Sequence, residues 1–393
     1  RLMNPQKTVD TGMKLVHRSM DAAKSSLSPV NVGVAVSEIR NRAEVFFLVA
    51  QSKKILEIQS PAPDPFPLAS LVEKAYEQAD FQILWALEGL GQEYATSFFK
   101  DDAEPTGILQ GAVEAALPAK SLSMLHAGMG QSFAQKLLED IDSNTQKSDL
   151  KEILSRFISL CHDNAQPEHI GAALESLGFV VRTSHSNLMS TVDEVLQEGD
   201  DASDLRGYFW HGAGRALYFI PINFLPFSDW QIFEMVRLEA PKEHLNSALA
   251  GVAWSFVLVN NKSPQVLSNL LLEKHGEDLA QEPGFINGVE SAMILRQDTT
   301  PDSQLSKDFY QYDPTAHGEQ VVEHWRSLVR QPSERAIAEF WPSLNEQKKI
   351  GSIFKYTDLA EASQESKPVV KASAKRSART ATKAKSSSKD AGA

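Results

Sequence analysis

Polar side chains suited to acid–base chemistry stand beside glycines at several points along the chain. Glu88 and His211 each directly precede a glycine, and His126 lies two residues before one. A carboxylate and two imidazoles that converge would hold a metal ion or act as general acid and base. Because no His-x-x-x-His or His-x-His pair is present, we predict catalytic roles for the three and no metal site. The alternative is that they cap helices or satisfy buried backbone groups.

Two further residues are candidates for ligand binding. Arg215 lies in the most apolar of these glycine-marked segments, and Asn287 directly precedes Gly288. A guanidinium group in a central cavity would bind a carboxylate or a phosphate. The alternative for Arg215 is an ion pair with a buried carboxylate such as that of Glu290.

The candidate residues belong to a short pattern that recurs about every forty residues: a glycine, small or apolar residues, then an aromatic or aliphatic run. With Gly171 counted as a degenerate copy, the spacings are 39, 43, 41, 39 and 37 residues. A glycine inside a helix costs about 1 kcal/mol relative to alanine, so its recurrence predicts helices whose backbones approach closely. The glycines expected to pack the repeats together are Gly89, Gly128, Gly171, Gly212, Gly251 and Gly288.

A period near forty without strand signals is typical of two helices per repeat. Segment 150–160 agrees, because its apolar residues recur with helical spacing. We therefore predict an all-α fold of about six helical hairpins closed into an α/α toroid, with an open α-solenoid as second choice. In a toroid the glycine-marked helices form the inner layer, and the candidate residues would converge at one end of it.

Proline and charge patterns indicate the domain boundaries. Four prolines interrupt residues 61–67, which we interpret as a connector after an N-terminal helical segment, 1–60. The helical-repeat domain then covers 68–362. Residues 363–393 consist mainly of Ser, Ala, Lys and Thr, so we predict a disordered basic tail.

The net charge of −12 conceals an asymmetry that bears on partners. Residues 367–393 hold eight basic residues and one acidic residue, a net +7, which leaves −19 on the other 366 residues. A body this acidic repels phosphate backbones, so we expect no specific nucleic-acid partner. The tail would contact acidic surfaces, remain a solvated extension, or fold back on the body.

The sequence also indicates the compartment. The most apolar stretch, 207–227, contains His211, Arg215 and two prolines, so we predict no transmembrane span. The only cysteine, Cys161, permits no disulfide within the chain and suits a reducing compartment. We therefore expect a cytoplasmic protein.

Three segments, in order along the chain, resemble the bacterial DUF1702 family, whose genes often neighbour enediyne-type polyketide clusters. They are 85–91 (WALEGLG), 124–130 (MLHAGMG) and 209–219 (FWHGAGRALYF). The resemblance spans about residues 80–305 and implies specialised metabolism more than a reaction, since the family has no assured activity. Residues 178–185 depart from the family's His-Glu-Gly-Tyr-Phe stretch, which puts any function of that stretch in doubt.

A weaker local likeness connects residues 211–214 to the inner helices of lanthionine cyclases, which are α/α toroids. Those enzymes hold zinc with two cysteines, and the single Cys161 excludes that chemistry. Nucleotide binding by Gly212-x-Gly214 would require a preceding strand and a third glycine, so we expect no cofactor.

Three classes of function remain open. The first is a helical-repeat protein that binds a small hydrophobic molecule or a partner protein in a specialised-metabolite pathway, without catalysis. The second is an enzyme with a polar site at the mouth of the helical ring. The third is a scaffold that binds a protein along an open groove. Convergence of the candidate residues on one pocket would favour the enzyme, and an open superhelix would favour the scaffold.

Overall fold

The computed structural model describes residues 29–59, 64–79, 82–99, 104–142, 144–199, 202–220, 223 and 229–364. Every element within these ranges is helical, and they contain no strand, so the predicted all-α class is confirmed. The predicted tail lies outside the described residues except for its first two positions, as do residues 61–63 of the predicted connector.

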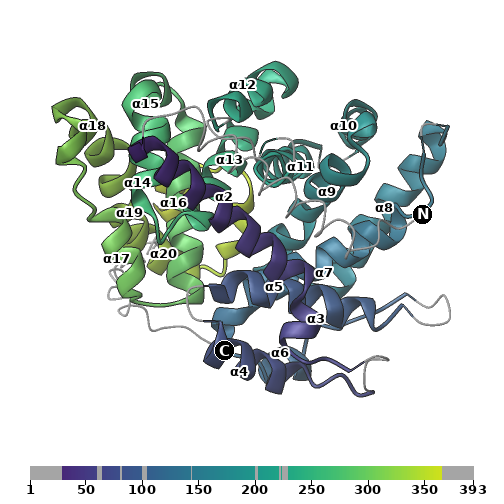
Figure 1. Cartoon of the computed structure of the whole chain (residues 1–393). Helices are drawn as coiled ribbons and strands as arrows, with labels where there is room; N and C mark the ends of the chain where they lie inside the picture. Colours follow the sequence, from purple (N-terminus) through teal and green to yellow (C-terminus); the bar gives the residue numbers. More distant parts are fainter. Residues whose placement is uncertain are drawn as a thin grey trace, which may run out of the picture.

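Six inner helices follow one another around the centre of the molecule (Figure 1). Each of them packs against the next in chain order. They bury residues on almost every face, as helices enclosed by neighbours must. Their bounds are α5 (Ile83–Thr96), α7 (Leu122–Leu137), α9 (Ile170–Ser184), α11 (Ala202–Leu217), α13 (Leu245–Val259) and α16 (Pro283–Thr299).

Outer helices cover this inner layer, and the longer ones each bury one apolar stripe. In the longest, α8, Leu150, Leu154 and Phe157 are buried, whereas Lys151 and Arg156 are exposed. Between α5 and α7 the outer helix is reduced to the four-residue α6, so this repeat is not the full hairpin that the sequence predicted. The outer helices are α4 (Leu68–Gln78), α6 (Ala112–Ala115), α8 (Lys147–Asn164), α10 (Met189–Gln197), α12 (Asp229–Glu239), α14 (Pro264–Val266), the π-helix η6 (Leu267–Leu272) and α15 (Glu273–Leu279).

Glycines bring the backbones of neighbouring inner helices into contact. A Cβ on Gly128 would lie 1.9 Å from the carbonyl oxygen of Glu88, and one on Gly212 would lie 2.0 Å from that of Glu175. Real Cβ atoms do not approach oxygen this closely, so only glycine fits these crossings. Gly251 and Gly288 contact the backbone of the preceding inner helix in the same way. We call these positions, together with Gly89, the lead positions.

In α9 the lead position is Ser176, not Gly171 as the sequence analysis predicted. The Ser176 hydroxyl donates to the carbonyl oxygen of Ala127 at 2.8 Å, which is the contact that a lead glycine makes elsewhere. Two residues later, Gly178 meets the backbone of Phe209 in α11. Gly171 instead packs on Gly351 of the C-terminal segment. Serine is tolerated here because its hydroxyl bonds to the oxygen that a larger side chain would hit.

The row of inner helices closes on itself. α16 contacts α5 as well as α13. Ser123 at the start of α7 donates to Asp298 near the end of α16 at 3.1 Å, and the Tyr76 hydroxyl donates to the carbonyl oxygen of Thr299 at 3.3 Å. The rings of Trp85 and Trp254 meet in the interior, with centroids 6.1 Å apart. These contacts make a closed helical ring with a filled centre, as the preferred toroid prediction requires.

A long N-terminal helix, α2 (Pro29–Ala50), crosses the ring diagonally in Figure 1. Its Arg42 pairs with Glu38 and, at 2.7 Å, with Asp229 of α12. The Arg42 guanidinium also lies 3.7 Å from the ring centroid of Tyr218, just after α11. The described part of the predicted N-terminal segment is therefore anchored on the ring by buried charged groups.

A continuous helical run follows the ring and packs against α16. Two parts of it are π-helix, η8 and η9, and each lies just before a proline, Pro332 or Pro342. Proline lacks an N–H and would clash with a carbonyl in the preceding turn of an α-helix. The wider π-turn accommodates the ring, so the run continues past both prolines. The run comprises α18 (Glu319–Trp325), η8 (Arg326–Arg330), α19 (Gln331–Arg335), η9 (Ala336–Phe340) and α20 (Trp341–Glu346).

Short elements connect these helices. Within the described ranges, no helix combines the length and apolar character needed to cross a membrane. The remaining elements are α3 (Ser52–Ile55), η2 (Ala119–Ser121), η3 (Ser186–Leu188), η5 (Lys242–His244), α17 (Gln304–Tyr310), η7 (Thr315–His317), η10 (Ile350–Phe354) and α21 (Leu359–Gln364).

The close helix crossings lead to a stability prediction. Gly128→Ala forces α5 and α7 apart and is expected to lower the free energy of unfolding by about 3 kcal/mol or more. Gly33→Ala is the matched control, because a Cβ there has no atom within 4 Å and lies in the exposed part of α2. We expect this control to raise stability by roughly 0.5–1 kcal/mol. Urea unfolding followed by circular dichroism measures both, and equal stabilities would contradict the crossing geometry.

Candidate functional site

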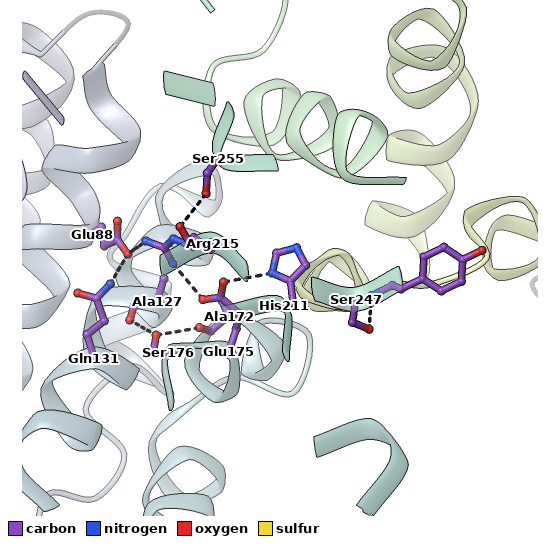
Figure 2. A network of polar contacts seen from close by, with 11 residues as sticks. Glu88, Ala127, Gln131, Ala172, Glu175, Ser176, His211, Arg215, Ser247 and Ser255 are labelled. Carbon is purple, nitrogen blue, oxygen red and sulfur yellow. Dashed lines mark hydrogen bonds and ion pairs between the residues drawn. The ribbon is translucent and has the colours of Figure 1, made fainter. Parts of the chain in front are cut away.

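The centre of the ring contains a buried network of polar side chains from four inner helices (Figure 2). Its members stand either directly before a lead position, as do Glu88, Glu175 and His211, or three residues after one, as do Gln131 and Arg215. These two positions lie one helical turn apart on the same face, so they point together toward the centre. All five side chains are buried.

Arg215 joins two carboxylates that come from different helices. Its Nη1 donates to Glu175 Oε2 at 3.0 Å, and its Nη2 donates to Glu88 Oε1. The guanidinium carbon lies 4.8 Å from the ring centroid of Phe179 and 5.1 Å from that of Trp254. The cation is therefore held between two acids in its plane and two aromatic rings beside it.

The network ends at an amide and at an imidazole. Gln131 Nε2 donates to Glu88 Oε1 at 2.5 Å, and His211 Nδ1 lies 3.1 Å from Glu175 Oε1. A proton on Nδ1 makes this last contact a hydrogen bond to the carboxylate. His211 Nε2 is buried and has no hydrogen-bond partner among the described residues.

The two carboxyl groups titrate in opposite directions. Burial raises the pKa of Glu88, and Arg215 offsets that only in part. Burial acts on Glu175 too, but Arg215 and His211 together outweigh it, so the pKa of Glu175 is lowered. Glu175 is therefore the carboxylate that balances Arg215, and Glu88 is the acid that retains a proton more readily.

The C-terminal segment closes one end of the ring over this network. Phe354 in η10 packs on Trp254, with ring centroids 6.3 Å apart, and is fully buried. The Gly351 N–H donates to the carbonyl oxygen of Glu168 at 2.7 Å. Beyond η10, Asn287 donates to the carbonyl oxygen of Thr357 at 2.7 Å. From this end of the ring, a substrate would have to displace the segment to reach His211 or Arg215.

Not all predicted site residues belong to this network. Glu88, His211 and Arg215 converge as predicted, but His126 and Asn287 make other contacts. Asn287 donates to Thr357 and so attaches the C-terminal segment to α16. Glu290, the predicted alternative partner of Arg215, pairs instead with Arg335. Among the described residues, no group of three His, Cys, Asp or Glu side chains is placed to hold a metal ion.

His126 has a structural role in this arrangement. Its Nδ1 donates to the carbonyl oxygen of Leu122 at 2.7 Å, and its Nε2 accepts the Gln166 N–H at 3.0 Å. Both nitrogens are thus occupied by backbone groups, and no proton is available for catalysis. This is the alternative that the sequence left open, a buried histidine that satisfies backbone groups.

Glu175 and Gln131 are the members that sequence reasoning missed. If Gly171 is taken as the repeat glycine of α9, Glu175 does not stand next to a lead position. Aligned on Ser176 and Gly178, the same helix puts Glu175 directly before the lead position, where Glu88 and His211 stand in their own repeats. The signal in the sequence is the Gly-x-Gly spacing of other copies, which recurs in α9 with serine at its first position.

A hollow of about 240 Å³ lies away from the ring centre, beside α18 and η8. A second, much smaller hollow borders Trp210 and Arg182. Neither is lined by Glu88, Glu175, His211 or Arg215. The larger is lined by Tyr312, Asp313, Pro314, Val322, Trp325, Arg326 and Arg330.

Comparisons with protein-family models, with curated proteins and with solved structures find no match for this chain.

Because the pKa of Glu175 is lowered and that of Glu88 is raised, replacing each acid by its neutral amide should have unequal effects on stability. Glu175→Gln leaves Arg215 without its charged partner and is expected to cost about 3–5 kcal/mol of stability at pH 7. Glu88→Gln resembles the protonated acid and is expected to cost about 1 kcal/mol or less. Urea unfolding at several pH values measures both, and equal costs would contradict the assignment.

The stability costs of Glu175→Gln and Glu88→Gln should change with pH in opposite directions. The lowered pKa of Glu175 adds stability above its ordinary value of 4.5, and this is lost as the pH falls through the folded-state value. The raised pKa of Glu88 adds stability below 4.5, and this is lost as the pH rises through the folded-state value. The cost of Glu175→Gln should therefore shrink in acid.

His126 gives a spectroscopic prediction. Burial, followed by the neighbouring His169, lowers its pKa from 6.5 to about 3. Its imidazole should stay neutral, with the proton on Nδ1, from pH 8 to about pH 4. Because the unfolded chain takes up this proton near pH 6.5, folded stability falls as the pH drops from 6.5 toward 3. Nitrogen-15 NMR, assigned with the His126→Gln variant, would refute this if the resonance titrates near pH 6.

Proposed function

We propose that the protein is a non-catalytic helical-ring protein that binds a small hydrophobic molecule or a partner protein on its outer surface. The observation that supports this most is the state of Arg215, whose guanidinium is paired with two carboxylates beneath a buried C-terminal segment. A substrate would have to compete with this mutual pairing to bind the charged groups, which favours a role other than catalysis.

The ring network fits a role in specifying the structure. A buried ion pair adds little net stability, but breaking it is costly, because a charge then stays unpaired in the interior. Arg215 reaches α5 and α9 from α11, so its pairing favours one register of the three helices. A rigid ring of this kind would present a constant outer surface to a ligand.

The wider setting of this function is also a proposal. The resemblance to the DUF1702 family supports a bacterial pathway of specialised, polyketide-type metabolism. A single buried cysteine is compatible with a cytoplasmic location. The acidic body supports partners other than nucleic acid.

One observation favours the second candidate, an enzyme with a polar site at the mouth of the ring. His211 Nε2 is buried and lacks a hydrogen-bond partner among the described residues, beside a carboxylate that orients its ring. A nitrogen held in this way could take a proton from a substrate if the C-terminal segment moved aside.

Complementation of a gene deletion separates the two candidates. Glu88→Gln and His211→Gln remove the proposed acid and base and should restore the metabolite profile of the deletion strain in proportion to the folded protein present. Profiles from mass spectrometry, normalised to protein abundance on immunoblots, provide the measurement. Folded variants that fail to restore the profile would establish the enzyme and refute the binding function.

A further inference from the structure

We propose that the hollow beside α18 and η8 is a ligand site for a small aromatic carboxylic acid. The proposal rests on the binding function proposed above and names the place and the chemistry of that binding. The hollow lies outside the ring, so a ligand can reach it without displacing the buried C-terminal segment.

Aromatic groups form one side of the hollow. The rings of Tyr312 and Trp325 meet edge to face, with centroids 5.3 Å apart. The indole Nε1 of Trp325 donates inward to the carbonyl oxygen of Tyr310 at 3.1 Å, so this ring has no free donor. Val322 and Pro314 extend the apolar lining. A flat apolar ring would pack against these groups by offset or edge contacts.

Arg330 supplies the polar end of the site. Its Nη2 donates to the carbonyl oxygen of Gln311 at 3.0 Å, which fixes the direction of the guanidinium. Its Nε is buried and has no hydrogen-bond partner among the described residues. A guanidinium has five donors in a planar fork that matches a carboxylate. A carboxylate seated in the hollow would pair with the Arg330 guanidinium, which borders it.

The other charged groups of the hollow have partners of their own. Arg326 forms two hydrogen bonds with Glu323, at 2.9 and 2.6 Å. The Asp313 carboxylate accepts the Thr315 N–H at 3.1 Å. Arg330, by contrast, forms no ion pair within the described part of the chain. Of the two cations that border the hollow, Arg330 is therefore the one whose charge is left for a ligand carboxylate.

The size of the hollow limits the ligand. Its volume of about 240 Å³ is below the roughly 300–1,000 Å³ of pockets that hold drug-sized molecules. One aromatic ring with one carboxylate suits this space, whereas a polycyclic molecule does not.

The π-helical turn of η8 displays both Arg326 and Arg330 toward this hollow, and π-turns are often found at functional sites.

Fluorine NMR with 4-fluorobenzoate as the probe tests the proposal on the full chain. We expect line broadening that reports binding at millimolar concentrations, as is usual for fragments of this size. The neutral analogue 4-fluorobenzyl alcohol should bind at least tenfold more weakly. Arg330→Gln should weaken binding of the acid at least tenfold, and Arg330→Lys, which keeps the charge but loses the planar fork, should weaken it less.

A control variant keeps the result specific. Arg156→Gln removes an exposed arginine that is paired with Glu104 on a distant surface and should have no effect. Thermal unfolding of each variant establishes that it is folded.

The possible outcomes separate this proposal from the proposed function. Equal binding of acid and alcohol, or unchanged binding by folded Arg330→Gln, would overturn the aromatic-acid site. Absence of any binding by the acid would overturn it as well. In these cases the broader binding function still depends on the complementation experiment. Loss of complementation by folded Glu88→Gln would overturn that function even if the hollow binds 4-fluorobenzoate.

Discussion

The rest of the structure depends on backbone contact between neighbouring inner helices. At the lead positions from Gly128 onward, the absence of a large side chain lets one helix rest on a carbonyl oxygen of the inner helix before it. Close crossings of this kind leave little freedom in the rotation or translation of a helix. The crossings at Gly128 and Gly212 therefore determine which of the residues that precede and follow each glycine face the centre of the ring.

The central network follows from that constraint. In four of the inner helices, the residue before the lead position or the residue three after it is buried at the centre, and there the charged side chains meet. Because these side chains are buried, acids and a cation must pair with one another to remain in the interior. Arg215 does this with Glu88 and Glu175 at once. The same enclosure that requires the pairing also removes these groups from contact with a substrate.

Much of the architecture was predictable. The forty-residue period, the glycines and the absence of strand patterns predicted an all-α repeat fold, and Glu88, His211 and Arg215 were correctly placed near one another. The errors concern local substitutions. Ser176 replaces a lead glycine and shifts one repeat by five residues, which concealed Glu175. His126 follows the pattern of a catalytic residue, yet the backbone groups of Leu122 and Gln166 occupy it.

The sequence alone determined the helical period and the positions where a side chain would prevent packing, because both depend on residue size and on spacing along one chain. Only the tertiary structure decided how the ring's charges pair, since Arg215 and Glu88 are 127 residues apart and meet only when the ring closes. It also decided that η10 covers the centre and that Arg330 borders a hollow. Such contacts depend on where distant segments lie in the folded chain. The glycine-marked repeat predicts which helices pack together but not which residues pair between them.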